Sequence, residues 1–176
     1  MANIFLTSDT HFGHAGVCKF LGADGSKMRP WTCPIEMDEA MIDRWNSVVR
    51  PRDTVYHLGD VTMTENNLAT VAKLNGKKIL IKGNHDIFAA SSYLEYFEDI
   101  RACHVLANCI LTHIPLHPSS LGRFGHNVHG HLHDRRVLLD AADPLSIDCR
   151  YFSACVEHHD YTPIALEKVR AQLIGP

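Results

Sequence analysis

The sequence predicts a mixed α/β protein that begins with a β-α-β-α-β unit. Three short apolar runs each end in polar residues, and two segments of helical character separate them. The length of 176 residues fits one domain over residues 1–176, and a composition with 45% hydrophobic and 21% charged residues is ordinary for a folded chain. We therefore expect one α/β domain whose polar residues gather at the ends of buried strands.

The first half of the chain supplies the strands and helices of that unit. Each apolar run is expected to be a buried strand that delivers polar side chains to a loop: residues 3–8, 54–60 and 77–86. Residues 14–33 are rich in Gly, Ser and Pro, which predicts a long loop. Pro34 suits the first turn of a helix that Pro51 closes. Residues 65–74 are expected to form a second helix, because Gly76 suits its end.

The second half predicts shorter elements. A short helical piece is expected near residues 91–97, followed by a hairpin over residues 100–113 that turns near Asn108. Three further segments are expected to be strands: residues 126–130, 135–140 and 149–157. The amphipathic tail, residues 163–173, predicts a final helix.

Charge, apolar runs and cysteines exclude several classes of protein. The net charge of -3 provides no basic stripe, so a long nucleic acid is not an expected partner. The N-terminus lacks the pattern of a signal peptide and no run of 18 apolar residues occurs, so we expect a cytoplasmic protein with no membrane partner. The six cysteines contain no C-x-x-C pair, which leaves a zinc ribbon or thioredoxin motif unsupported.

Histidine is the one abnormal count, and the histidines recur with acids at predicted strand ends. The chain has 13 histidines, and the chemistry-bearing clusters are Asp9-Thr10-His11, Gly59-Asp60, Gly83-Asn84-His85-Asp86, Thr112-His113 and Gly130-His131-Leu132-His133. Imidazole, carboxylate and amide oxygen are ligands of zinc, manganese and iron. No cysteine belongs to these clusters, which argues against a closed structural zinc site.

The number and spacing of these residues favour two metal ions. In extended backbone, Asp9 and His11 would point the same way, as would His131 and His133, so each pair could converge on one ion. One ion rarely needs more than four protein ligands. The candidates exceed that number and suit two ions that share an acid: Asp9, His11, Asp60, Asn84, His113, His131 and His133.

The series D-x-H, G-D, G-N-H-D, H and G-H-x-H resembles the calcineurin-like metallophosphoesterase superfamily, from Asp9 to His133. The stretches SDTHFGH, DTVYHLGDV and ILIKGNHD are similar to a branch of small single-domain prokaryotic and phage-type phosphoesterases that lack cap domains. The resemblance implies a calcineurin-like α/β sandwich of mixed β-sheets flanked by helices.

The resemblance also implies a role for each residue of the clusters. It assigns the first ion to Asp9, His11, Asp60 and His133, and the second to Asp60, Asn84, His113 and His131, with Asp60 bridging. It places His85 against the scissile phosphate as a catalytic residue, with Asp86 orienting His85 through a hydrogen bond. Two divalent ions are the implied cofactors. Manganese is expected, and iron, zinc, nickel and magnesium also suit these ligands.

These observations predict a dimetal-dependent hydrolase of a small phosphodiester, cyclic or short and nucleotide-like, in which a metal-bridging hydroxide attacks phosphorus. A phosphomonoesterase, a catalytically weak metal-binding scaffold and a metal sensor stay open as alternatives. Substrate contacts are expected from Asn84, His14 and Arg123, although His14 also suits a loop histidine bonded to backbone and Arg123 a solvated loop arginine. His57 is expected to be a buried supporting residue. The oligomeric state is not predicted.

Overall fold

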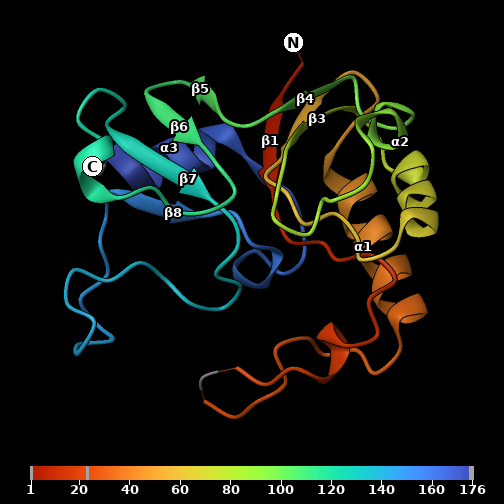
Figure 1. Ribbon diagram of the computed structural model, residues 1–176, viewed down its shortest axis with the longest axis horizontal. Helices are drawn as coiled ribbons and strands as arrows, with labels where there is room; N and C mark the ends of the chain where they lie inside the picture. The colour runs from red at the N-terminus through yellow and green to blue at the C-terminus, as the bar shows by residue number, and fades with distance from the viewer. Residues whose placement is uncertain (1, 23, 175–176) are drawn as a thin grey trace.

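Two β-sheets form the centre of the computed structural model, which describes residues 2–22 and 24–174 (Figure 1). The first sheet has the strand order β4-β3-β2-β1-β9, with bounds Asp99–Arg101, Lys77–Ile81, Thr54–His57, Ile4–Thr7 and Ile164–Ala165. The second has the order β5-β6-β7-β8, with bounds His104–Leu106, Cys109–Leu111, His126–His129 and Tyr151–Ser153.

Strand direction decides where the loops of each sheet meet. Strands β1, β2, β3 and β4 run parallel, and only β9 is antiparallel, against β1. In the second sheet β6, β7 and β8 run parallel and β5 is antiparallel to β6. Because parallel strands end on the same side, the loops after β1, β2 and β3 share one edge, and so do those after β6 and β7.

Helices cover the outer face of the first sheet (Figure 1, right). They are α1 (Pro34–Val48), the 3₁₀ helix η2 (Glu65–Lys73) and α2 (Ala90–Leu94). Helix α3 (Leu166–Ile174) packs against β9 and β1 of the first sheet and β8 of the second. Three short 3₁₀ turns complete the helices of the described residues: η1 (Val17–Lys19), η3 (Pro118–Ser120) and η4 (Val156–His158). None of the helices in the described part of the chain has the length and apolar run that a bilayer crossing requires.

The core has two main layers, which follow from the alternation of side chains along each strand. Phe5 packs toward the helices with Met41 and Trp45 of α1. Its neighbour Leu6 points the other way, into the layer between the sheets, where it joins Leu111 and Phe152 of the second sheet. Both sheets are therefore anchored by apolar side chains, and their polar strand ends are held in fixed positions.

The mixed α/β class and most expected elements are confirmed, with several differences. The tail helix begins at Leu166 because Ile164–Ala165 pairs with β1, and the strand expected over residues 149–157 is limited to Tyr151–Ser153, with η4 following it. The predicted helix over residues 65–74 is a 3₁₀ helix. The hairpin begins at His104 rather than at residue 100, because Asp99–Arg101 pairs with β3. The predicted strand over residues 135–140 is wrong: only a single bridge, Leu138 to Ile147, forms there.

Local turns explain the missing strand. The carboxylate of Asp140 accepts a hydrogen bond from the main-chain N–H of Ala142, and that of Asp143 accepts one from Leu145. Such side-chain bonds stabilise turns in competition with a strand ladder. Pro144, which has no N–H to donate, disfavours pairing further.

Candidate metal centre

The polar clusters of the two sheets meet at one edge of the molecule. The loops after β1, β2 and β3 carry Asp9, Asp60 and Asn84, while those after β6 and β7 carry His113 and His131. Hydrogen bonds join the sets. The main-chain N–H of His131 donates to Asp9 Oδ2 at 2.9 Å, and His113 Nδ1 donates to the carbonyl of Leu58 at 2.7 Å. The strand-end placement expected from the sequence thus brings the seven candidates into one region.

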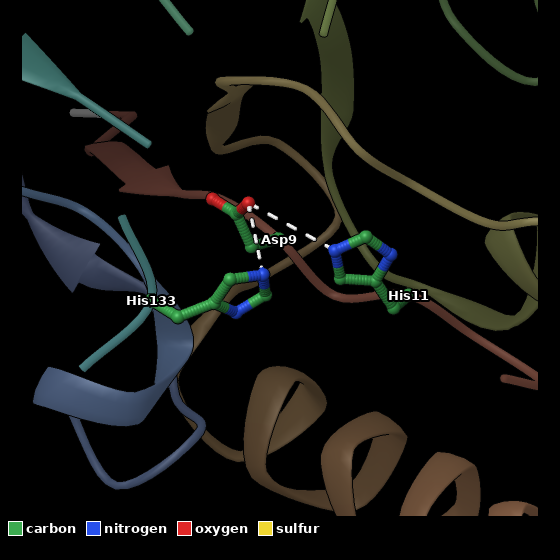
Figure 2. A group of neighbouring side chains, drawn as sticks. All are labelled: Asp9, His11 and His133. Carbon is green, nitrogen blue, oxygen red and sulfur yellow. Dashed lines mark ion pairs between the residues drawn. The ribbon is translucent and has the colours of Figure 1, made fainter. Parts of the chain in front are cut away.

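Asp9, His11 and His133 form the first group, with one ligand atom of each within 4.8 Å of the others (Figure 2). Asp9 Oδ1 lies 3.9 Å from His11 Nε2 and 3.9 Å from His133 Nε2. Asp9 Oδ1 and His11 Nε2 are buried and have no hydrogen-bond partner among the described residues. Buried polar atoms without a partner are costly, so this spacing fits a cation held between them.

Asp60, His113 and His131 form the second group by the same criterion. His113 Nε2 lies 3.4 Å from Asp60 Oδ2 and 2.9 Å from Asn84 Oδ1, which is itself 3.0 Å from His131 Nδ1. In the neutral ring of His113 the single proton goes to Leu58, so the lone pair of Nε2 faces two acceptor oxygens. Lone pairs that converge in this way repel one another, and a bound cation would offset that repulsion.

Asp60 links the two groups. Besides its contact with His113, its Oδ2 lies 3.8 Å from His11 Nε2, an atom of the first group. Its Oδ1 accepts a hydrogen bond from the main-chain N–H of His85 at 2.9 Å. Burial alone would raise the pKa of Asp60, but when His113 is protonated its hydrogen bond and charge, together with the His85 N–H, lower the pKa of Asp60 to about 2. The shared carboxylate is therefore ionised at neutral pH, the form that binds a cation.

The backbone at these positions is unusual. Nine described residues other than glycine have a positive φ, and five of them are candidate ligands: Asp9 (59°), His11 (47°), Asp60 (57°), His131 (72°) and His133 (53°). L residues adopt this left-handed conformation in only a few per cent of cases. Residues held in sparsely populated conformations cluster at functional sites, so the backbone supports the side-chain chemistry in marking this region.

Two glycines allow the ligand loops to approach closely. A Cβ on Gly83 would lie 2.3 Å from Asp60 Oδ1, and one on Gly130 would lie 2.6 Å from Asp9 Oδ2. Neither position has room for a side chain. The glycines of G-N-H-D and G-H-x-H thus bring backbone against the two carboxylates.

The expectation that His131 and His133 converge on one ion is wrong. It assumed extended backbone, but both residues have a positive φ, and His131 joins the second group while His133 joins the first. The distribution implied by the family resemblance matches the two groups. Asp9 and His11 do share a group, although their backbone is not extended either.

His85 is half-exposed beside the second group, whereas its neighbour Asp86 is buried. The His85 side chain is 46% exposed, its Nε2 is 4.0 Å from Asp60 Oδ2, and its ring lies 5.8 Å from that of His11. The expectation that Asp86 orients His85 through a hydrogen bond is wrong. Both Asp86 oxygens are instead occupied by main-chain N–H groups, those of Asp60, Val61 and Gly83. Asp86 therefore shapes the loops that carry the ligands.

The other two expected substrate contacts differ in position. The ring of His14 lies 5.8 Å from that of His11, so His14 belongs to the surroundings of the first group. Arg123 does not: it lines a cavity of about 290 Å³ together with His126 and Arg170. His126 begins β7, whose other end leads to His131, so Arg123 lies at the opposite edge of the sheet. The expectation that Arg123 contacts a substrate at the metal centre is wrong for this reason.

Sequence reasoning missed two charged residues at the first group, Arg29 and Glu157. Arg29 is fully buried, and its guanidinium lies 2.7 Å from Glu157 Oε1. Glu157 Oε1 also lies 3.0 Å from His133 Nδ1. The partners are 128 residues apart in the chain, and neither belongs to a local motif, so no pattern could have paired them.

His57 confirms its expected role as a buried supporting residue. It is 1% exposed, its Nε2 lies 3.0 Å from Thr10 Oγ1, and its Nδ1 accepts the main-chain N–H of Gly59. Burial lowers the pKa of His57 from 6.5 to about 3. The folded protein therefore keeps this ring neutral while the unfolded chain protonates it.

This difference predicts acid sensitivity of the metal-free fold. Stability should fall as the pH drops from about 6.5 toward 3, since only the unfolded state takes up the proton, at about 1.4 kcal/mol per pH unit. Between pH 7 and pH 5 the share of His57 is about 2 kcal/mol. Urea unfolding of the chelated protein measures the free energy of unfolding at pH 7 and pH 5. Between these two values it should fall by about 2 kcal/mol less in His57→Gln than in the wild type. The exposed control His117→Gln should behave like wild type, and an unchanged pH effect in His57→Gln would refute the assignment.

The fold and the paired histidine-aspartate groups define a mixed α/β protein with a candidate dinuclear metal centre. No established family profile matches the chain. It is 31% identical over 173 residues to the uncharacterized protein MJ1445 of Methanocaldococcus jannaschii, covering 96% of this chain and 90% of that protein. The chain belongs to the family of MJ1445.

Two further proteins are similar. The gene 66 protein of Mycobacterium phage D29 is 35% identical over 91 residues, which is 49% of this chain and 41% of that protein. The crystal structure of the protein of unknown function AQ665 from Aquifex aeolicus has a TM-score of 0.65 and 25% sequence identity, covering 97% of this chain and 98% of that chain. The fold therefore has a solved counterpart along nearly its whole length.

Proposed function

We propose that the protein is a dimetal-dependent phosphoesterase of the calcineurin-like type that hydrolyses a small phosphodiester. The observation that carries this proposal is the pair of groups joined by Asp60, in the first of which Asp9 Oδ1 and His11 Nε2 are buried without hydrogen-bond partners among the described residues. The first ion would be held by Asp9, His11 and His133, and the second by His113, His131 and Asn84, with Asp60 shared between them. Manganese suits this oxygen and imidazole set, as do iron, zinc, nickel and magnesium.

The chain provides the remaining parts of a hydrolytic site. Two divalent ions bound there would make a water molecule acidic and offset negative charge on a phosphate. His85 presents a half-exposed ring beside Asp60, where it would donate a proton to the departing oxygen of the ester. His14 would contact the substrate from the loop after the first group. Burial and the charge of Arg29 lower the pKa of His11 well below its ordinary value, which keeps this ligand neutral.

Charge and motifs favour a small phosphate ester over a long polyanion. The net charge of -3 provides no broad basic surface for a long polyanion. The resemblance of the D-x-H, G-N-H-D and G-H-x-H motifs is to hydrolases of phosphoric esters, in which a proton donor such as His85 assists loss of an alcohol. A phosphomonoesterase is the second candidate, and a catalytically weak metal-binding scaffold the third. The cytoplasmic location stays a prediction.

Hydrolysis assays with metal reconstitution test the proposal. Chelated protein should be inactive, and addition of Mn²⁺ should restore release of nitrophenol from bis-(p-nitrophenyl) phosphate. The same assay with p-nitrophenyl phosphate ranks the diester against the monoester. Binding of two ions with no hydrolysis of either ester would favour the scaffold. A chain that binds no divalent ion would overturn the proposal altogether.

A further inference from the structure

Arg29 and Glu157 form a buried ion pair beneath the first group that the hydrolytic reaction itself does not use. Arg29 is fully buried, and the Glu157 side chain is 3% exposed. Arg29 donates to Glu157 Oε1 from Nε at 3.0 Å and from Nη2 at 2.7 Å. A buried pair of this kind is costly to desolvate and is weak as a source of stability, so its placement calls for a different explanation.

The other N–H groups of the Arg29 guanidinium donate to the loop after β1, which carries the candidate ligands Asp9 and His11. Its Nη2 donates to the carbonyl of Asp9 at 2.6 Å, and its Nη1 donates to the carbonyl of Thr10 at 2.8 Å. These carbonyls lie within the segment Asp9-Thr10-His11, whose ends have a positive φ. The planar fork of a guanidinium can hold several acceptors at once in one geometry, which a lysine cannot do.

Glu157 makes the matching contact to the third ligand. Its Oε1 lies 3.0 Å from His133 Nδ1, which donates a proton because a carboxylate can only accept. In the neutral ring, the form that binds a metal ion, the other nitrogen, Nε2, then carries the lone pair, 3.9 Å from Asp9 Oδ1. A hydrogen bond on one ring nitrogen of histidine sets the tautomer and the orientation of the other.

We infer that Arg29 and Glu157 are a positioning pair for the first group alone, aligning Asp9, His11 and His133 through one connected set of hydrogen bonds. The pair spans the long loop of residues 14–33 and the segment after β8, so it ties the ligands of the first sheet to a ligand of the second. No side-chain bond from either residue reaches Asp60, His113 or His131 among the described residues. The inference rests on the metal-binding part of the proposed function.

Manganese binding to the purified, chelated protein tests this inference without substrate. Removing one charge alone would leave the other buried, so the variant is the double replacement Arg29→Met with Glu157→Leu, which removes both charges at similar volume. Calorimetry with Mn²⁺ should show one site weakened about 10- to 100-fold, the usual effect of losing such a supporting bond, and the other unchanged. The paired-manganese signal in electron paramagnetic resonance should disappear at limiting Mn²⁺.

Two further variants make the result specific. Arg29→Met with Glu157→Gln returns an acceptor to His133 but not the bonds from Arg29 to the Asp9 and Thr10 carbonyls, so it should recover part of the lost affinity. Asp148→Asn breaks a different acid–arginine pair, Asp148 with Arg150 at 2.6 Å, and should leave both sites intact.

The outcomes separate this inference from the proposed function. Two sites of wild-type affinity in the leucine variant, equal weakening of both sites, or no recovery in the glutamine variant would each overturn the positioning role. Failure of the wild-type protein to bind Mn²⁺ would instead overturn the metal centre.

Discussion

Asp60→Asn is expected to lower kcat/KM for an aryl phosphodiester by at least about a thousandfold, which corresponds to about 4 kcal/mol. The reason is the position of one oxygen: Asp60 Oδ2 lies 3.4 Å from His113 Nε2 and 3.8 Å from His11 Nε2, so it serves both groups. Asparagine keeps a single neutral amide oxygen at this position, so the two ions would lose the shared negative charge and one of its two oxygens. The stoichiometry of bound Mn²⁺ should fall below two.

Asparagine is the informative replacement because Asp60 has a φ of 57°. Asparagine tolerates the left-handed conformation better than most residues, so the backbone stays in place and the loss can be assigned to the charge. Asp43→Asn, on the exposed face of α1, is the matched control and should retain full activity. An Asp60→Asn protein that keeps two manganese ions and normal turnover would remove the basis for a shared carboxylate.

His85→Ala is expected to lower kcat by about a hundredfold while both metal ions remain bound. The side chain is 46% exposed and belongs to neither group, and its nearest acid is Asp60 Oδ2 at 4.0 Å. A residue in that position would act on the proposed substrate rather than on the metal ions. Steady-state kinetics and Mn²⁺ stoichiometry measured on the same preparation separate these two roles.

Comparing esters with different leaving groups makes the His85→Ala experiment more specific. A proton donor matters most when the departing alcohol is a poor leaving group, so the loss in His85→Ala should be larger for an alkyl ester than for a nitrophenyl ester. His117→Ala, at an exposed position in the second half of the chain, should leave both rates unchanged. Equal losses for the two esters, or release of a metal ion, would argue that His85 only maintains the shape of the site.

Much of the fold was predictable from local chemistry. Pro34 and the spacing of Met41 and Trp45 predict α1, which the structure has over Pro34–Val48. The apolar runs predict β1, β2 and β3 because a buried strand needs little more than apolar side chains between polar ends. The predicted strand over residues 135–140 failed because the carboxylates of Asp140 and Asp143 stabilise turns, an effect that hydrophobic patterning does not register.

The sequence predicted which residues form the site better than it predicted how they are arranged. All seven candidate ligands gather at one edge, since strand ends in a parallel arrangement must meet there. The assignment of His131 and His133 to different groups depends on left-handed backbone angles that residue spacing cannot reveal. Arg123 was misplaced because it precedes β7 and therefore lies at the end of that strand opposite His131, which the expectation did not take into account.

The left-handed ligand residues have a consequence for how this family can change. Each such residue holds its backbone in a conformation that costs roughly 1–2 kcal/mol for an L side chain, whereas glycine adopts it freely and asparagine at less cost. The conformational cost summed over the five positions is comparable with the net free energy of unfolding of a small domain. If these residues bind metal ions as proposed, selection must maintain them against the stability that their replacement would add. A lineage that no longer needs the chemistry should drift toward glycine and asparagine at these positions while keeping the fold.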